Sequence, residues 1–218
     1  TFSNAPPLDQ HLRNELNHWR SVHSGVVVNE RTALNLNSVF ACVRAISETM
    51  ASLPLPTYRR LDPCGKQRFR DHPAFHILNV SPDGEMSAMQ WREAGLGHLL
   101  TWGNSYNETE WTRGGELLAA HLLPPNKVTP QRTKAGALEY KLDGSIVPIP
   151  ANRMLHVAGL GFDGIKGYSP VRIGREAIGL AMATERFGAT WFGNGSRGQG
   201  VITHPATLSD DARKNLRT

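Results

Sequence analysis

One segment of the chain has the glycine spacing of a nucleotide-binding loop. The stretch from Gly159 to Gly164 reads G-x-G-x-x-G and follows the strand-like residues 155–157, the order that a dinucleotide-binding motif requires. In that motif a helix begins among the glycines, so that its N-terminus meets the pyrophosphate. Here the next helix is predicted to begin only at Ser169, and no second strand comes before Phe192. Turn glycines explain the segment better, and a nucleotide-binding enzyme domain is kept as an alternative.

Two further patterns could carry chemistry. Gly167, Ser169 and Val171 stand where a strand passes into a helix, as around a nucleophilic serine. In that arrangement the residue after the serine donates an N–H to an oxyanion, and Pro170 has no N–H to give. We therefore predict that Gly167 forms a turn, that Ser169 caps a helix and that Pro170 occupies its first turn.

His72 and His76 stand four residues apart, a spacing that can place two imidazoles on one metal ion. A metal needs three or four ligands, and no carboxylate or thiol shares this spacing. The sequence therefore predicts no metal site, no cofactor and no catalytic group.

The predicted helix that begins at Ser169 and runs unbroken to Phe192 carries a row of arginines. At about 100° per residue, Arg172, Arg175 and Arg186 share one arc of its surface. An ordinary exposed face, with an ion pair between Arg172 and Glu176, is one interpretation. A face turned to phosphates or to another subunit is the other.

The same helix, about 35 Å long, is rich in small residues that permit close approach of another backbone but raise the cost of the helix. We expect another element to pack against it. The residues that would make this contact are Gly174, Ala177, Gly179, Ala181, Ala183 and Gly188.

Helical and strand patterns are segregated along the chain, which favours an α+β fold over alternating α/β. The segment 38–53 has a strong apolar stripe and is expected to be a core helix. Residues 24–35 resemble an extended arm, and Ser209 would cap a helix that has only begun at Thr218, so we expect the natural protein to continue. The other predicted elements are helices at 8–19, 71–78 and 87–102, a hairpin after residue 55, and strands at 107–112, 117–123, 128–132, 138–142, 146–149, 154–157 and 200–203.

Composition sets broad limits. The chain has 218 residues, a net charge of +5 and two cysteines, so it is long enough for a real core and too poor in cysteine for a disulfide framework. It contains no apolar run of the length that a membrane-spanning helix needs. The mild basic excess permits a polyanionic partner without requiring one.

The order of several short motifs resembles the portal, or head-to-tail connector, protein family of tailed double-stranded-DNA bacteriophages. The resemblance spans residues 35 to 218, and its strength lies in the order and spacing together. The motifs are His72-Pro73 with Leu78-Asn79, Trp102-Gly103-Asn104-Ser105-Tyr106, Leu123-Pro124-Pro125, Leu155-His156-Val157, Gly164 with Gly167-Tyr168-Ser169-Pro170, Asn194-Gly195 and Gly200-Val201-Ile202.

The resemblance implies a structural subunit without enzymatic activity and without a membrane partner. Such proteins form a ring, usually of twelve copies, at one capsid vertex. Double-stranded DNA passes through the ring, and terminase, capsid and tail adaptor proteins dock on it. Its location would be the virion, with assembly in the host cytoplasm.

By the same resemblance, the regions would be an N-terminal helix and arm (1–34), a wing-like domain (35–166), a stem-like helix (167–195) and the start of a clip-like region (196–218). The small residues of the helix would pack against neighbouring subunits, and its three arginines would lie near DNA. A monomeric DNA-binding module is the second alternative.

Overall fold

A computed structural model describes residues 22–161 and 163–196. The chain divides into two compact units, Thr1–Ala183 and Thr184–Thr218. The helix predicted at 8–19, the strand at 200–203 and the helix capped by Ser209 lie outside the described residues.

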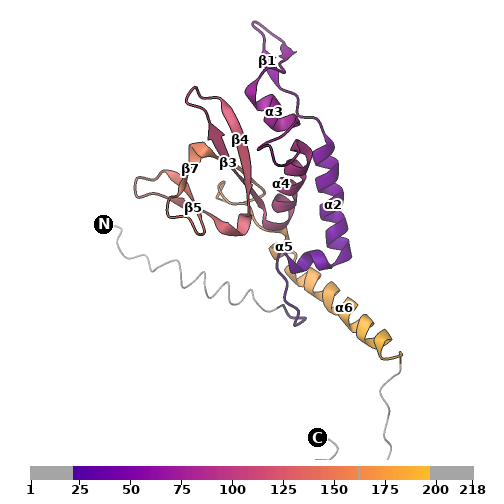
Figure 1. The fold of residues 1–218 in the computed structure, drawn as a ribbon. Coiled ribbons are helices and arrows are strands. Elements are labelled where there is room, and N and C mark those ends of the chain that lie inside the picture. The colour runs from indigo at the N-terminus through magenta and orange to yellow at the C-terminus, as the bar shows by residue number, and fades with distance from the viewer. Residues whose placement is uncertain (1–21, 162, 197–218) are drawn as a thin grey trace, which may run out of the picture. The chain divides into compact units, whose positions relative to one another are not determined.

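Helices form one part of the first unit, as Figure 1 shows. Helices α2 and α4 lie side by side, and α4 also contacts strand β3. The helical elements are η1 (Thr32–Asn35), α2 (Asn37–Ser52), α3 (Pro73–Asn79), α4 (Ala88–Trp102), η2 (Pro125–Lys127), η3 (Ala151–Arg153), α5 (Pro170–Ile173) and α6 (Arg175–Gly193), the last of which continues into the second unit.

The strands form three small antiparallel sheets. One is the β1–β2 hairpin (Tyr58–Arg60 and Lys66–Arg68). A second has the order β4-β3-β8, and a third has the order β5-β6-β7. Their bounds are β3 Asn104–Trp111, β4 Leu117–Leu123, β5 Val128–Arg132, β6 Leu138–Leu142, β7 Ile149–Pro150 and β8 Met154–Ala158. The α+β class is confirmed, and the strands predicted between residues 107 and 142 and at 154–157 lie where expected, with shifts of a few residues at their ends. The strand predicted at 146–149 is wrong except at Ile149, where β7 begins.

Local chemistry accounts for the bounds of α4. The Ser87 hydroxyl accepts the backbone N–H of Gln90, and the Gln90 side chain accepts the N–H of Ser87, which forms a capping box. At the other end Gly103 adopts φ +75°, the left-handed conformation that ends many helices. Gly103 is therefore the single residue between the end of α4 and the start of β3.

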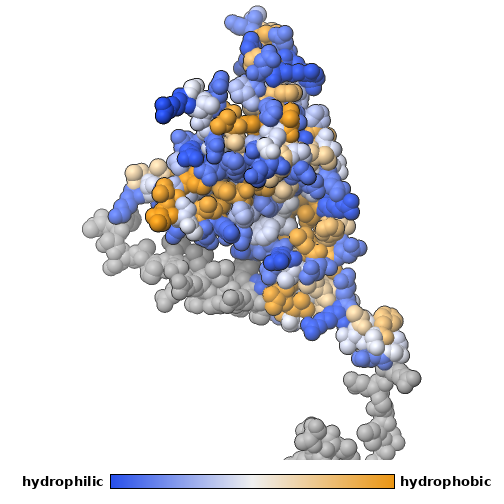
Figure 2. Space-filling model, viewed as in Figure 1, coloured by the Kyte–Doolittle hydropathy of each residue, from blue (hydrophilic) through white to orange (hydrophobic). Residues whose placement is uncertain are grey.

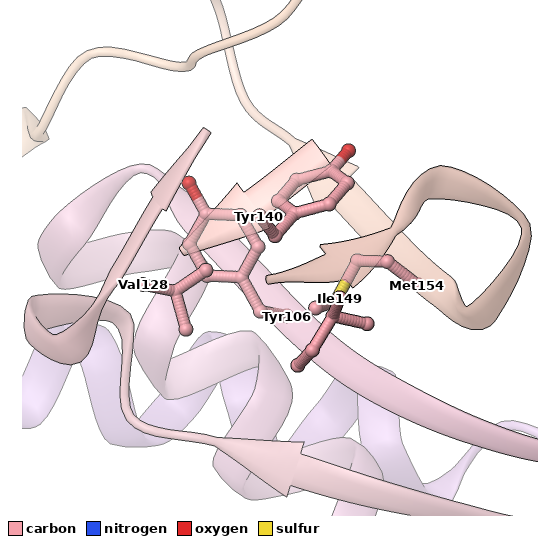
Figure 3. Close-up of a cluster of buried hydrophobic side chains, with 5 residues drawn as sticks. All are labelled: Tyr106, Val128, Tyr140, Ile149 and Met154. Atoms are coloured by element: carbon pink, nitrogen blue, oxygen red, sulfur yellow. The ribbon is translucent and has the colours of Figure 1, made fainter. Parts of the chain in front are cut away.

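The apolar core consists of separate clusters. Figure 3 shows the one that joins the two three-stranded sheets, with Tyr106, Val128, Tyr140, Ile149 and Met154 facing one another. A second cluster unites α3, α4 and β4 around Ile77, Trp91 and Ala120. A third places Val22, Val28 and Ala33 of the N-terminal arm against Val171, with Val39, Ile178 and Met182 packed around them.

Two predictions about helices are wrong. The helix after Ser169 is not unbroken, because Gly174 leaves the helical conformation at φ −83° and ψ 10° and separates α5 from α6. Helix α2 is not a core helix, because only Ser47 and Ala51 of its sixteen residues are buried. Its apolar stripe remains largely exposed.

Smaller differences have equally local causes. The helix predicted at 71–78 begins only at Pro73, because His72 precedes it as the cap and its Nδ1 accepts the N–H of Ala74. The predicted arm at 24–35 ends in the 3₁₀ turn η1 instead of staying extended to Asn35. Both cysteines, Cys42 and Cys64, are free and exposed. Among the described residues no helix has the length and apolar character that crossing a membrane would demand.

Candidate functional site

The glycine-rich segment forms a backbone junction between three parts of the chain. The N–H of Gly159, just after β8, donates to the carbonyl oxygen of Gly103 at 2.8 Å. A Cβ on Gly167 would lie 2.1 Å from that same oxygen, and a Cβ on Gly103 would lie 2.0 Å from the carbonyl oxygen of Tyr168. These glycines are required because the backbones touch, which is a structural reason for the motif that needs no phosphate.

Asn104 holds this junction together. Its side-chain Oδ1 accepts the N–H of Gly167 at 2.8 Å, and its Nδ2 donates to the carbonyl oxygen of Gly167 at 2.8 Å. The same Oδ1 lies 3.0 Å from the Nε2 of His156. One buried amide therefore ties the first residue of β3 to β8 and to the turn that leads into α5.

The surroundings of His156 fix its tautomer. Both contacts with Gly167 orient the Asn104 amide with its oxygen toward His156, so the Nε2 must carry the proton and donate it. The Nδ1 is then the acceptor for the hydroxyl of Tyr140, 3.3 Å away. The ring also stacks on Tyr106, with 4.3 Å between centroids. Burial lowers the pKa of His156 below its usual value, against a smaller opposing effect of the Asp163 carboxylate.

Ser169 is a helix cap, as predicted. Its Oγ accepts the N–H of Arg172 at 3.1 Å and donates to the carbonyl oxygen of Thr101 in α4 at 2.7 Å. Pro170 follows in the first turn of α5. Together with Gly167 in the turn, these contacts couple the start of α5 to the end of α4.

The three predicted arginines have different surroundings. The Arg172 Nε lies 2.7 Å from the Oε1 of Glu30, a carboxylate that is only 7% exposed. The Arg175 Nε is buried and has no hydrogen-bond partner among the described residues. Arg186 belongs to the second unit and is exposed. The ordinary alternative, an ion pair between Arg172 and Glu176, is wrong, because Glu176 contacts His23 at 3.3 Å instead.

The small residues of α6 also differ from one another. A Cβ on Gly179 would lie 2.4 Å from the Cγ1 of Val22 and 3.0 Å from the Oγ of Ser24, so this glycine makes room for the arm of its own chain. A Cβ on Gly188 would meet no described atom within 4 Å. Gly174 lies at the break before α6. The structure thus supplies a contact within the chain for Gly179, and subunit packing by the set stays a prediction for Gly174, Ala177, Ala181, Ala183 and Gly188.

Two helices expose apolar side chains. From periodicity alone, these side chains would be expected to be buried. On α2, Ile46 and Met50 are 47% and 50% exposed and lie on one face four residues apart, and Leu53, directly after the helix, is 50% exposed. On α6, Leu180 is 65% exposed in the first unit, and Phe187 is 71% exposed in the second. Figure 2 shows hydrophobic surface interspersed with polar surface over this part of the molecule.

Other candidate sites are less developed. Across the described ranges no group of three histidine, cysteine, aspartate or glutamate side chains is placed to hold a metal ion. An open pocket of about 610 Å³ lies between the β3–β4 hairpin and η3, and its acidic and basic walls, Glu110 and Arg153, each contact an opposite partner, His121 and Glu108. The polar contacts described above join elements of the fold to one another.

Comparison with known proteins identifies relatives of this chain. The chain is 30% identical over 210 residues to the probable portal protein of Streptomyces phage phiC31, covering 89% of this chain and 44% of that protein. It is 26% identical to the portal protein of Enterobacteria phage HK97, covering 87% of this chain and 45% of that one. The chain thus spans a little under half the length of these curated relatives.

Solved structures agree at the level of the fold. The chain superposes with a TM-score of 0.66 and 21% identity on a chain in the neck of an empty gene transfer agent particle, covering 86% of this chain and 53% of that one. The TM-score is 0.55, with 15% identity, for an HK97-family phage portal protein from Corynebacterium diphtheriae, covering 85% and 57%. A sequence model described as phage portal protein matches residues 37–218, which include the Asn104 junction and both exposed helix faces. The resemblance noted from short motifs is thereby confirmed, and the chain belongs to the phage portal protein family.

Proposed function

We propose that the chain is a structural, non-enzymatic subunit of a portal ring at one vertex of a phage capsid. The ring surrounds a channel through which double-stranded DNA passes during packaging and ejection. Terminase, capsid and tail adaptor proteins are its partners, the host cytoplasm is its place of assembly and the virion its final location. Membership of the portal family is the observation that carries this proposal.

The number of subunits in the proposed ring is twelve. Two similar structures are necks of gene transfer agent particles: a native one computed with C12 symmetry, with a TM-score of 0.58, and an empty one computed with C6 symmetry, which a twelve-fold ring also satisfies, with a TM-score of 0.66. A cyclic ring is closed by heterologous contacts, so each subunit needs two different surfaces for its neighbours. The exposed apolar side chains of α2 and α6 would supply such surfaces, because contiguous exposed apolar patches mark sites of protein interaction.

Within this proposal residues 35–166 form the wing, 167–195 the stem and 196–218 the start of the clip, after an N-terminal helix and arm at 1–34. Among the three arginines, Arg186 is the best candidate to face DNA, because Glu30 neutralises Arg172 at 2.7 Å. The Asn104 junction then has a mechanical role. It joins the end of the wing to the first turn of the stem through short, buried hydrogen bonds.

Electron microscopy of the complete gene product tests the proposal. Rings with a central hole are expected, with a mass by light scattering that matches twelve copies. A single monomeric species at micromolar concentration would contradict it.

Titration with labelled nucleotides separates the ring subunit from the enzymatic alternative, since saturable micromolar binding would favour the latter. The variant for that titration is Gly164→Asn, because a Cβ there meets no described atom and asparagine tolerates the left-handed φ of +68° better than alanine does. A Cβ on Gly161 would lie 2.1 Å from the carbonyl oxygen of Lys166 and would disturb the fold itself.

A further inference from the structure

The positive charge of the chain is concentrated in one hairpin. Residues 58–70, which contain β1, β2 and their turn, hold five cations and one carboxylate, a net charge of +4, whereas the whole chain has a net charge of +5. All the cations are exposed. They are Arg59, Arg60, Lys66, Arg68 and Arg70. The labelled β1 end of Figure 1 is largely hydrophilic in the matching view of Figure 2.

The strand register collects three of these cations on one face. Arg60 pairs with Lys66, and Tyr58 pairs with Arg68. Directly paired residues share a face, and so do residues two apart along a strand. Tyr58, Arg60, Lys66 and Arg68 therefore point to the same side, where the Lys66 Nζ lies 5.0 Å from the centre of the Tyr58 ring. Arg59 belongs to the opposite face and lies over Phe69 at 4.0 Å.

This face is electrostatically costly in the isolated chain. Like charges directly opposite each other destabilise a strand pair, and Arg60 and Lys66 are such a pair. In the part of the chain that the structure describes, none of the hairpin cations forms an ion pair with a carboxylate. A two-stranded hairpin is only marginally stable by itself. An anion from outside the chain would remove the repulsion.

The shape and composition of the face favour duplex DNA over an acidic protein. A two-stranded β-ribbon fits the major groove of DNA, and lysine and arginine on its surface can neutralise phosphates. Arginine and tyrosine also occur often in protein interfaces, but the centres of those interfaces are depleted of charged residues, whereas three of the four side chains on this face are cations. We propose that the β1–β2 hairpin binds the phosphate backbone of duplex DNA through Arg60, Lys66 and Arg68, without reading the base sequence. This contact is separate from the channel arginines and does not require a ring.

Fluorescence anisotropy with a 30-base-pair duplex of mixed sequence tests the proposal on the full chain. Three phosphate contacts give a slope of log affinity against log salt of about −2.7, so affinity should fall about 40-fold between 50 and 200 mM salt. In the triple variant Arg60→Ala, Lys66→Ala, Arg68→Ala, this salt-dependent component should disappear. A change of the duplex sequence should leave the affinity unaltered.

Two variants guard against misreading the result. The triple variant Arg113→Ala, Lys134→Ala, Lys141→Ala removes the same charge from exposed positions elsewhere and should bind like the parent. Replacing Arg60 and Arg68 by lysine keeps the charges and should preserve binding, which would show that positive charge and not the guanidinium group is required. The proposal is overturned if the duplex fails to bind at 50 mM salt, or if both triple variants lose affinity equally. It is also overturned if polyglutamate binds more tightly than the duplex, since an acidic protein surface would then be the partner.

Discussion

Asn104 shows how one side chain can position two long elements. Its amide satisfies the N–H and the carbonyl of Gly167 and also accepts from His156, all within a buried region where water is scarce. Each buried polar group left without a partner costs about 1–3 kcal/mol. Asn104 is therefore expected to contribute far more to the stability of the fold than an asparagine on the surface.

The variant Asn104→Ala should lower the free energy of unfolding by about 3 kcal/mol, because it leaves both polar groups of Gly167 unpaired. Urea denaturation followed by circular dichroism measures this change. Asn152→Ala in the exposed turn η3 is the matched control and should alter stability by less than about 0.5 kcal/mol. Equal effects of the two variants would contradict the role assigned to Asn104.

A pH dependence follows from the buried histidines. Burial lowers the pKa of both His98 and His156, so in the acidic range the unfolded chain binds protons that the folded chain does not. The free energy of unfolding should therefore fall as the pH decreases from 7 to 5, by at most about 1.4 kcal/mol per pH unit for each histidine. Thermal unfolding between these values tests this.

The same pH series on variants assigns the effect. His156→Gln should reduce the slope, and His98→Gln should reduce it further. His76→Gln, at an exposed position of α3, should leave it unchanged. A slope that is the same in all four proteins would exclude the buried histidines as its source.

At the level of elements, the sequence predicted those strands and helix starts that depend on residues close together in the chain. Alternating residues and glycine turns placed the strands, and Ser87 and Ser169 marked helix starts because a cap depends on neighbours three residues away. Periodicity shows that α2 is amphipathic but not whether its own chain covers Ile46 and Met50. The pairing of Asn104 with Gly167 joins residues 63 positions apart, and its sequence signal was the Trp-Gly-Asn-Ser-Tyr motif directly after α4.

The sequence also could not predict the helix break at Gly174 or the packing contact at Gly179. A glycine inside a helical pattern indicates either a break or a close approach, and only packing decides which. At Gly174 the helix is interrupted, whereas at Gly179 it continues and Val22 approaches. Arg172 likewise pairs with Glu30 and not with Glu176 of the next helix, because the N-terminal arm packs against α5.

The pair Gly179→Ala and Gly188→Ala separates packing within the chain from packing between copies. Gly179→Ala should destabilise the chain by about 1–3 kcal/mol, since the new Cβ would lie 2.4 Å from Val22. Val22→Ala in the same background should recover part of the loss. Thermal unfolding measures both effects, and an unaltered melting temperature in Gly179→Ala would contradict the contact.

Gly188→Ala meets no described atom and should stabilise the helix of the isolated chain by up to about 1 kcal/mol. If another copy packs at this position in the ring, the same variant should nevertheless weaken assembly, which light scattering detects.

For the whole molecule, exposed apolar surface is the property on which the proposed assembly depends. The double variant Ile46→Asp, Met50→Asp should leave the isolated chain folded with a modestly lower melting temperature, because both side chains are already about half exposed but the two new carboxylates repel each other. It should prevent ring formation by the complete gene product, because buried carboxylates at an interface are costly. Thr49→Asp on the same helix is the control for added charge. Rings formed equally by all three proteins would exclude α2 from the interface.

The chain has two thiols, and each lies near one of the two proposed contact surfaces, so its reactivity can report on contacts there. Cys64 lies in the turn of the cationic hairpin, and Cys42 lies on α2 about 40° around the helix axis from Ile46. Alkylation rates can therefore be followed at both places without engineering. Slower maleimide modification of Cys64 on adding a duplex, and of Cys42 on oligomerisation, would map the two contacts independently in a single mass spectrum.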